Sequence, residues 1–267
     1  MISLKRNSKG NLMPASGKRV RAYSIYQPGQ ETDFEISRTA FSDFLKCPRD
    51  FYLNKVLGLK EPSMPSWPLN STVDELYKKE FDVCREKQVP HRLMWKNQLP
   101  HVVPFKHEKM DEWRDALRGG IKNRYKDSNI ILKGGIDDAW LNTQDSSMII
   151  VDYKSQAKAK LETSKYFEDV FHQDYAIQLD FYNYLFREAG FKMNDTAYIL
   201  VANANKDKSA FDGCLTFEEA FIPYKWDADW IPDKVDQMLK VLNSSSIPDE
   251  NPYCELCAYN REVKNLF

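Results

Sequence analysis

Two short stretches near the middle of the chain carry side chains that could hold a metal ion. Asp137 follows a Gly-Gly-Ile sequence, and 15 residues later Asp152 and Lys154 end an apolar run in the order D-Y-K. Side chains alternate between the two faces of a strand, so Asp152 and Lys154 point the same way and Tyr153 points the other way. Two carboxylates and a lysine suit Mg²⁺ or Mn²⁺, because these hard cations prefer oxygen ligands and keep waters that can be activated as nucleophiles.

The elements that must position these residues are two strands joined by a polar turn. Residues 136–141 and 148–153 are mostly apolar, and residues 142–147 between them are polar turn formers. This pattern predicts a β-hairpin in which Asp137 can lie across from the Asp152 end. The alternative is a solvated strand end with a surface ion pair.

The combination of G-x-I-D and D-Y-K resembles the core of the PD-(D/E)XK phosphodiesterases, in their RecB-like exonuclease branch. The resemblance implies an α/β protein with a restriction-endonuclease-like core, in which a mixed central β-sheet is flanked by helices. It also implies that Asp137 and Asp152 hold the metal together with a backbone carbonyl of Val151 or Tyr153. Lys154 would orient or help deprotonate the attacking water and stabilise the charge of the transition state.

A third metal ligand is expected on a helix that begins at Asn70 or Ser71. Relatives typically read G-x-x-x-H in this helix, with the histidine on the metal, and this chain has Asp74 at the matching place. An aspartate is a good ligand for a hard cation, so the resemblance implies Asp74 as the third acid. Glu75 is the competing assignment, about 100° away around the helix, and a solvated helix face is the alternative for both.

A second long helix is expected from about Tyr166 to Ala189, ended by Gly190. Gln178 and Tyr182 are four residues apart in it and therefore share a face. The resembled branch carries Q-x-x-x-Y here, near the active site, which implies that both residues position the substrate strand. A tyrosine packed in the core is the alternative.

The segment Ser37–Leu57 is similar to the opening of RecB-like and CRISPR-associated exonucleases, where a serine-led helix runs into C-P-x-x-F-Y. Relatives with an iron–sulfur cluster use one cysteine there and three near the C-terminus. Cys47, Cys254 and Cys257 match three of these, but no cysteine follows Tyr259. A [4Fe–4S] cluster normally needs four thiolates, so we predict no cluster or one at poor occupancy. Zinc on the three thiols with a fourth ligand from outside the set is the alternative.

The remaining elements follow from periodicity and turn signals. We expect, in chain order, an irregular or β connection over 89–106, a helix over 108–125, strands over 195–202 and 214–224, and a helix over 226–242.

Composition bounds the domain organisation. With 267 residues and 42% hydrophobic content, the chain can bury a substantial core, and we expect one nuclease-like domain over residues 34–267. Residues 1–33 read as a basic extension in which Lys and Arg alternate with Gly, Ser and Pro. Such a segment could touch phosphates or merely keep the chain in solution.

Charge and cysteine usage exclude several classes of protein. The chain has 38 Lys and Arg residues against 39 Asp and Glu residues, so its net charge does not indicate binding of nucleic acid. Any phosphate-binding surface must therefore be local. Five scattered cysteines argue against a disulfide framework. No run approaches the length of a membrane span, so we expect a soluble cytoplasmic protein.

The sequence therefore predicts a Mg²⁺- or Mn²⁺-dependent deoxyribonuclease that hydrolyses DNA phosphodiester bonds, as an exonuclease of repair, recombination or defence with protein partners there. One alternative is a nucleic-acid-binding module of the same fold, weak or inactive in catalysis, within a larger complex. Another is a metal-binding protein with no nucleic acid. The intact set of Asp137, Asp152 and Lys154 favours the enzyme.

Overall fold

A computed structural model describes residues 4–62, 67–161 and 163–266 of the chain. The chain divides into two compact units. Unit 1 comprises Met1–Ser66, Arg124–Leu132 and Asp229–Phe267, and unit 2 comprises Trp67–Asn123 and Lys133–Ala228. The division into an extension over 1–33 and one domain over 34–267 stays a prediction, and residues 1–3 of that extension lie outside the described residues.

Unit 2 is built on a five-stranded mixed sheet. Its strand order is β2-β5-β6-β7-β8, with bounds Val102–Pro104, Asp138–Asn142, Ser147–Gln156, Thr196–Ala204 and Phe217–Lys225. β5 and β6 are antiparallel, which confirms the predicted hairpin. β6 and β7 are parallel, so the chain must cross over between them, and the crossover contains helix α6. The mixed sheet with its helices confirms the predicted fold class.

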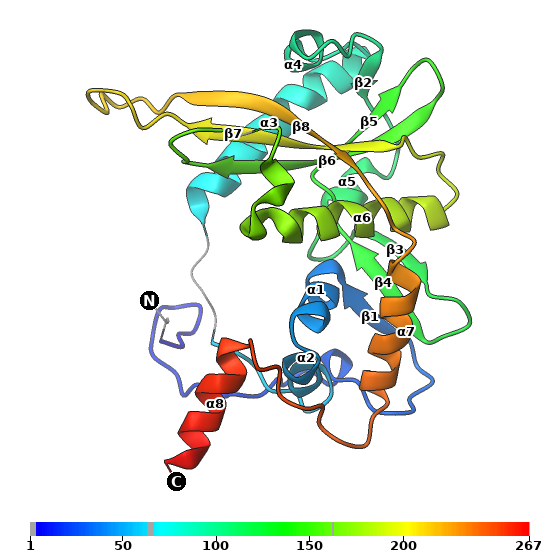
Figure 1. The fold of residues 1–267 in the computed structure, drawn as a ribbon, viewed down its shortest axis with the longest axis vertical. Helices are drawn as coiled ribbons and strands as arrows, with labels where there is room; N and C mark the ends of the chain where they lie inside the picture. The colour runs from blue at the N-terminus through cyan, green and yellow to red at the C-terminus, as the bar shows by residue number, and fades with distance from the viewer. Residues whose placement is uncertain (1–3, 63–66, 162, 267) are drawn as a thin grey trace. The chain divides into compact units, whose positions relative to one another are not determined.

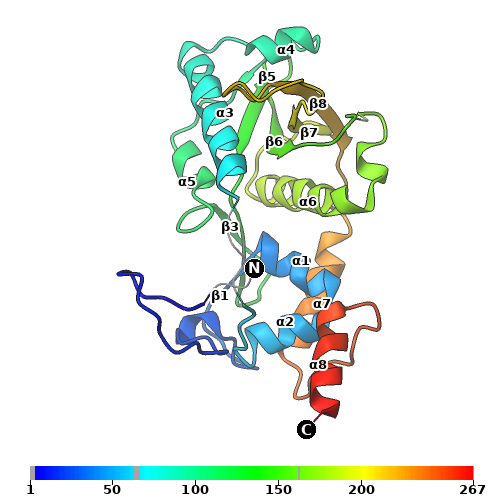
Figure 2. The ribbon, with the colours of Figure 1, turned by 90° about the vertical axis from the view of Figure 1, so that its left-hand side faces the viewer.

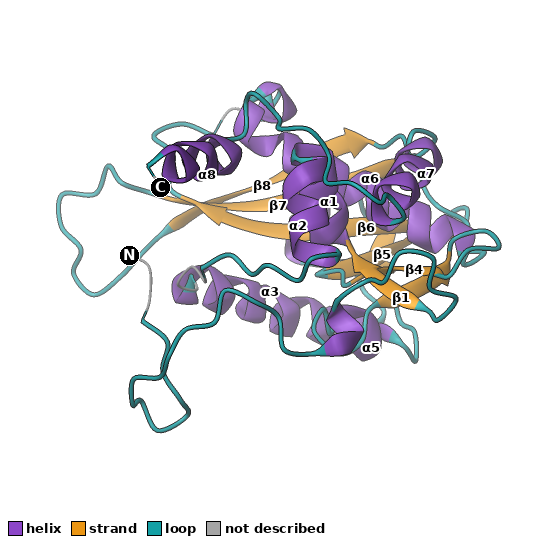
Figure 3. Ribbon diagram, turned by 90° about the horizontal axis from the view of Figure 1, so that it is seen from below, coloured by secondary structure: helices purple, strands orange, loops and turns teal. Residues whose placement is uncertain are grey.

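Helices α3 (Pro68–Lys87) and α6 (Gln173–Glu188) cover opposite faces of this sheet (Figures 1 and 2). In Figure 3 the strands form a layer with α3 on one side of it. The α3 face holds an aromatic core, where the fully buried Trp140 stacks on Phe81 with ring centroids 5.4 Å apart. Tyr153 of β6 belongs to the same core, so its neighbours in the strand face α6.

Unit 1 is mainly helical. It contains η1 (Ala22–Ser24), β1 (Phe34–Ser37), α1 (Arg38–Lys46), α2 (Pro48–Lys55), α7 (Ile231–Leu242) and α8 (Glu255–Asn265). The Ser37 hydroxyl accepts a hydrogen bond from the backbone N–H of Ala40 at 3.2 Å, which confirms the predicted serine-led helix. A three-stranded sheet has the order β1-β4-β3, and β3 (Ile121–Arg124) and β4 (Ile130–Gly134) each run from one unit into the other.

The predicted helix over 108–125 is wrong. Only α5 (Met110–Arg114) is helical there, and the chain then turns into β3. At Gly119 an added Cβ would lie 2.3 Å from the carbonyl oxygen of Glu112, and Gly120 has a φ of +86°. The two glycines therefore fold the chain back on α5. The buried apolar residues Met110 and Trp113 belong to α5 and Ile121 belongs to β3, whereas Leu117 in the turn is exposed.

The starts of two predicted helices also differ from the expectation. α3 begins at Pro68 with Trp67 at its N-cap, because a proline suits the first helical position, so Asn70 and Ser71 lie inside the helix. The long second helix begins only at Gln173, after the short turns η2 (Tyr166–Glu168) and η3 (Val170–His172).

The connection over 89–106 contains β2 and also a short helix, α4 (Arg92–Lys96), that the sequence reading missed. Among the described residues no helix combines the length and the apolar character needed to cross a membrane.

Candidate active site

The end of β6 presents an ion pair to the α6 face of the sheet. Lys154 Nζ donates to Asp152 Oδ2, and Gln178 Nε2 from α6 donates to Asp152 Oδ1 at 2.7 Å. Both carboxylate oxygens are therefore held, and the Asp152 side chain is only 1% exposed. The ammonium of Lys154 also lies 4.9 Å from the centre of the Tyr175 ring. The structure thus brings Asp152, Lys154 and Gln178 together as the sequence patterns suggested.

Asp137 lies beside this pair. It directly precedes β5, and its Oδ2 accepts a hydrogen bond from the backbone N–H of Tyr153 at 2.9 Å. The hairpin therefore closes as expected, with Asp137 just before β5 and Asp152 in β6. Unlike Asp152, Asp137 keeps 26% of its side chain exposed to solvent.

Asp74 reaches the same region from α3, accompanied by a lysine that sequence reasoning missed. Lys78 Nζ lies 2.7 Å from Asp74 Oδ2 and 3.7 Å from Asp137 Oδ1, so one ammonium bridges both acids. The i,i+4 spacing of Asp74 and Lys78 was the available signal. The other oxygen, Asp74 Oδ1, is buried without a hydrogen-bond partner.

Burial and neighbouring carboxylates shift the pKa values of the candidate site residues. Burial, followed by the nearby Asp137, raises the pKa of Asp74. Burial also raises the pKa of Asp152, and Asp137 adds to that rise while Lys154 opposes it. Burial alone would lower the pKa of Lys154, but Asp152 and Asp137 outweigh it and raise that pKa, so the amine stays an ammonium. The clustered carboxylates thus favour the binding of a cation and the charged form of a nearby amine.

The donor set fits a hard divalent cation. Asp74, Asp137 and Asp152 offer only oxygen ligands, and Asp74 Oδ1 is an orphaned buried acceptor. Among the residues that the structure describes, only a cysteine-rich group has three or more ligand atoms all within 4.8 Å of one another. The ligand oxygens of the three acids therefore do not all lie within 4.8 Å of one another. Lys78 pairs with Asp74 and Asp137, and Lys154 pairs with Asp152.

Tyr182 lies behind Gln178 on α6. Gln178 Nε2 also approaches the Tyr182 hydroxyl, at 3.2 Å, and both residues are buried. A Cβ added to Gly134 would lie 2.8 Å from the Tyr182 ring, so only glycine leaves room for the tyrosine beside the strand. This contact gives a physical reason for the first glycine before Asp137.

A second acid of the hairpin, Asp138, was not identified from the sequence. Its side chain is fully buried, and its Oδ1 accepts from Arg85 Nη2 at 2.6 Å and from Arg114 Nη2 at 2.8 Å. The Tyr153 hydroxyl donates to its Oδ2 at 2.7 Å. Asp138 and Tyr153 thus tie β5 and β6 to α3 and α5 on the face opposite Asp152.

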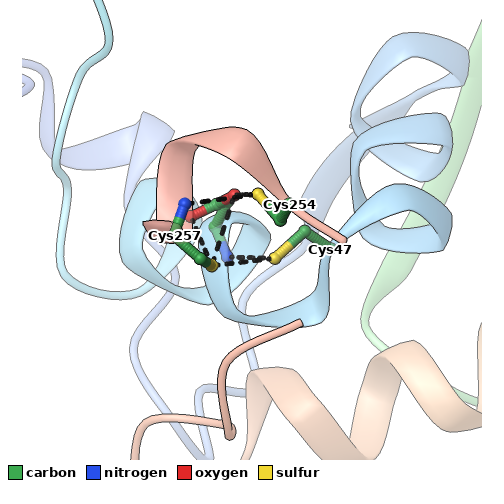
Figure 4. Close-up of side chains that lie close together, drawn as sticks. Cys47, Cys254 and Cys257 are labelled. Carbon is green, nitrogen blue, oxygen red and sulfur yellow. Dashed lines mark hydrogen bonds between the residues drawn. The ribbon is translucent and has the colours of Figure 1, made fainter. Parts of the chain in front are cut away.

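The three predicted cysteines come together in unit 1. Figure 4 shows Cys47, Cys254 and Cys257 converging from α2 and α8, and Asp50 takes the fourth place in the group. An iron–sulfur cluster of four irons has a thiolate on each iron. Three thiols and one carboxylate do not fit that requirement.

A mixed sheet whose hairpin carries two acids and a lysine, with helices on both faces, defines the class of restriction-endonuclease-like phosphodiesterases. The family model of the PD-(D/E)XK nuclease superfamily matches residues 64–261, about three quarters of the chain. The chain belongs to this superfamily. Its members are nucleases, and the match supports a nuclease hydrolase with a nucleic-acid substrate. The RecB-like branch stays a prediction.

No curated protein matches the chain. A solved structure titled "Crystal structure of SSO0001" is 14% identical over 85% of this chain and 84% of that one, with a TM-score of 0.34.

The Asp138 network yields a stability prediction. Asp138→Asn removes the buried negative charge and leaves Arg85 and Arg114 facing a neutral amide, so we expect the free energy of unfolding to fall by about 3–5 kcal/mol. Urea unfolding followed by circular dichroism measures this. Asp207→Asn, in an exposed loop, is the matched control and should change stability by no more than about 0.5 kcal/mol. Equal stability of the two variants would contradict the assigned role.

Proposed function

We propose that this chain is a metal-dependent nuclease that hydrolyses DNA phosphodiester bonds, acting as an exonuclease in DNA repair, recombination or defence. The observation that carries the proposal is the buried Asp152 carboxylate, held between Lys154 and Gln178 beside Asp137. Family membership supports the reaction class. Family membership does not specify DNA as the substrate, the exonuclease mode or protein partners in a repair or defence complex, so these are parts of the proposal.

Asp74, Asp137, Asp152 and the backbone carbonyl of Tyr153 would hold Mg²⁺ or Mn²⁺. Such an ion supplies a Lewis acid and a water activated for attack. Two features support the assignment: the donors are all oxygens, and one of them, Asp74 Oδ1, has no other partner. Asp74 and Asp137 are also partly exposed, which gives an ion access from solvent.

Lys154 is the group proposed to act on the reacting atoms. In its ion pair with Asp152 the amine is an ammonium and can only donate hydrogen bonds. It is therefore suited to orient the attacking water and to stabilise the negative charge that grows on the phosphoryl oxygens.

Gln178 is proposed as a positioning residue. Its amide fixes the rotamer of Asp152, and the Tyr182 hydroxyl lies within reach of the same amide. Both side chains are buried, so they hold the Asp152 carboxylate from the protein interior. Direct contact of Gln178 and Tyr182 with the substrate strand stays a prediction.

The activity is tested with purified protein and Mg²⁺ or Mn²⁺ on end-labelled linear and circular DNA, in single- and double-stranded form, with RNA in parallel. We expect metal-dependent cleavage of linear DNA and none of circular DNA, because an exonuclease needs an end. Cleavage of circular DNA would replace the exonuclease assignment by an endonuclease one. Binding without cleavage would instead support a nucleic-acid-binding module, and neither binding nor cleavage would reject both.

Two substitutions test the assigned chemistry. Asp152→Asn deletes a charged ligand with little change in volume, and we expect at least a ~100-fold loss of cleavage with the fold retained. Lys154→Ala should lower turnover by about 10²- to 10³-fold while sparing metal binding, as measured by calorimetric titration. Lys158→Ala, a more exposed lysine further along the chain, is the matched control. Parental cleavage rates in either site variant would refute the roles.

Asp74 is tested against its helical neighbour. Asp74→Ala should weaken Mn²⁺ affinity and cleavage by at least about tenfold, because it removes an oxygen ligand, whereas the exposed Glu75→Ala should leave both unchanged. Asp74→His should recover part of the activity, since histidine is a metal ligand at the matching position of relatives. Equal effects of the two alanine substitutions would leave Asp137 and Asp152 as the only side-chain ligands.

A further inference from the structure

Four potential metal ligands converge in unit 1, whereas the acids described above belong to unit 2. Their ligand atoms, the Sγ of Cys47, Cys254 and Cys257 and a carboxylate oxygen of Asp50, all lie within 4.8 Å of one another. Cys47 Sγ is 3.6 Å from Cys257 Sγ, and Cys257 Sγ is 3.7 Å from Asp50 Oδ1. Figure 4 shows the three sulfurs turned toward one centre.

These spacings are those of ligands around one ion. With Zn–S bonds of about 2.3 Å, two sulfurs of a tetrahedral zinc site stand about 3.8 Å apart. Cys254 Sγ lies 2.8 Å from Asp50 Oδ2, where the thiol donates to the carboxylate, and an ion between them would replace this contact. In a cluster of four irons each thiolate binds its own iron, so the sulfurs would stand further apart.

The four ligands form two matched pairs. Cys47 and Asp50 are three residues apart at the start of α2, and Cys254 and Cys257 are three residues apart at the start of α8. In each pair the backbone N–H of the second residue donates to the sulfur of the first, at 3.5 Å for Asp50 and 3.4 Å for Cys257. Structural zinc sites commonly take their ligands from C-x₂-C pairs. Here Asp50 occupies the place of the second cysteine in the first pair.

The group is both buried and accessible. Cys47 and Cys257 are 3% and 2% exposed, so their thiols are shielded from bulk water. A pocket of about 480 Å³ is lined by Cys47, Asp50 and Cys254 and also by the acids Asp43 and Glu61. Lys46 also lines this pocket, so a cation has an entry path on which acids outnumber the one base.

No disulfide accounts for the arrangement. The sulfurs of Cys47 and Cys257 are 3.6 Å apart, against about 2.0 Å in a disulfide bond, and all three cysteines are free. Thiolates are soft donors that favour zinc over hard cations, and four ligands complete its tetrahedron.

We propose that Cys47, Asp50, Cys254 and Cys257 bind one Zn²⁺ ion, with the Asp50 carboxylate in place of a fourth thiolate. The ion links the start of α2 to the start of α8, two helices separated by most of the chain. It thereby fixes the C-terminal helix within unit 1. Four protein ligands leave no open position, so the site is structural.

The first test is metal analysis of the full chain, purified without chelators or affinity metals, under anaerobic and reducing conditions. We expect about one zinc per chain and no acid-labile sulfide. About four irons and four sulfides per chain would overturn the proposal in favour of a cluster, and so would a chain that neither carries zinc nor takes it up on titration.

The second test isolates Asp50. We expect Asp50→Asn to weaken zinc affinity, measured by competition with a chromogenic chelator, by about 100-fold or more. Asp249→Asn, at an exposed acid of the same unit that does not line the pocket, is the matched control for charge, and Cys214→Ser is the control for an exposed thiol. Both controls should keep parental affinity.

A variant that adds a ligand distinguishes loss of the metal site from misfolding of the protein. Asp50→Cys supplies a fourth thiolate, so it should bind Co²⁺ in place of zinc with stronger sulfur-to-metal charge-transfer absorption than the parent protein. Unchanged zinc affinity in Asp50→Asn, or identical cobalt spectra of parent and Asp50→Cys, would show that Asp50 is not a ligand. None of these readouts depends on nuclease activity, so the zinc site and the proposed function fail or hold separately.

Discussion

The buried charge of Asp138 is the constraint on which the geometry of unit 2 depends. A carboxylate taken out of water destabilises a protein by several kcal/mol unless cations and donors surround it. Here Arg85, Arg114 and the Tyr153 hydroxyl meet both of its oxygens. Since α3 supplies Arg85, β5 supplies Asp138 and β6 supplies Tyr153, one charge fixes a helix and both strands of the hairpin in a single arrangement.

That arrangement determines where the candidate catalytic groups lie. With Tyr153 locked on the α3 face, strand alternation sends Asp152 and Lys154 to the α6 face, where Gln178 meets Asp152. The backbone N–H of the same tyrosine holds Asp137. A slip of one residue in the β5–β6 register would exchange the faces and drive Lys154 into the aromatic core. Structural and candidate catalytic residues therefore alternate along one strand, and neither set could shift alone.

What the sequence could and could not reveal follows from the range of the interactions. The hairpin and the shared face of its D-x-K ending depend on local alternation, so both were predictable. Asp138 adjoins Asp137 in sequence, yet its arginine partners come from 24 and 53 residues away, and no local pattern distinguishes a buried acid from an exposed one. Lys78 was overlooked for a similar reason, because only packing brings it to Asp137. The false helix over 108–125 shows the converse error, in which apolar residues at helical spacing belong to a short helix and to a strand on either side of a turn at Gly120.

The two candidate metal centres differ in the chemistry of their donors, and this difference bears on how each would select its ion. Zinc binds most sites more tightly than Mg²⁺ or Mn²⁺ does, so selectivity has to come from ligand type and geometry. The acids of unit 2 offer neither thiolate nor imidazole, so their oxygens favour a hard cation. The group in unit 1 offers three sulfurs and one carboxylate, which suits zinc and leaves no position for an activated water. Each unit thus carries donors that favour a different metal. The acids of unit 2 favour Mg²⁺ or Mn²⁺ for hydrolysis, and the thiols of unit 1 favour a structural Zn²⁺, so one chain can bind both ions at separate sites.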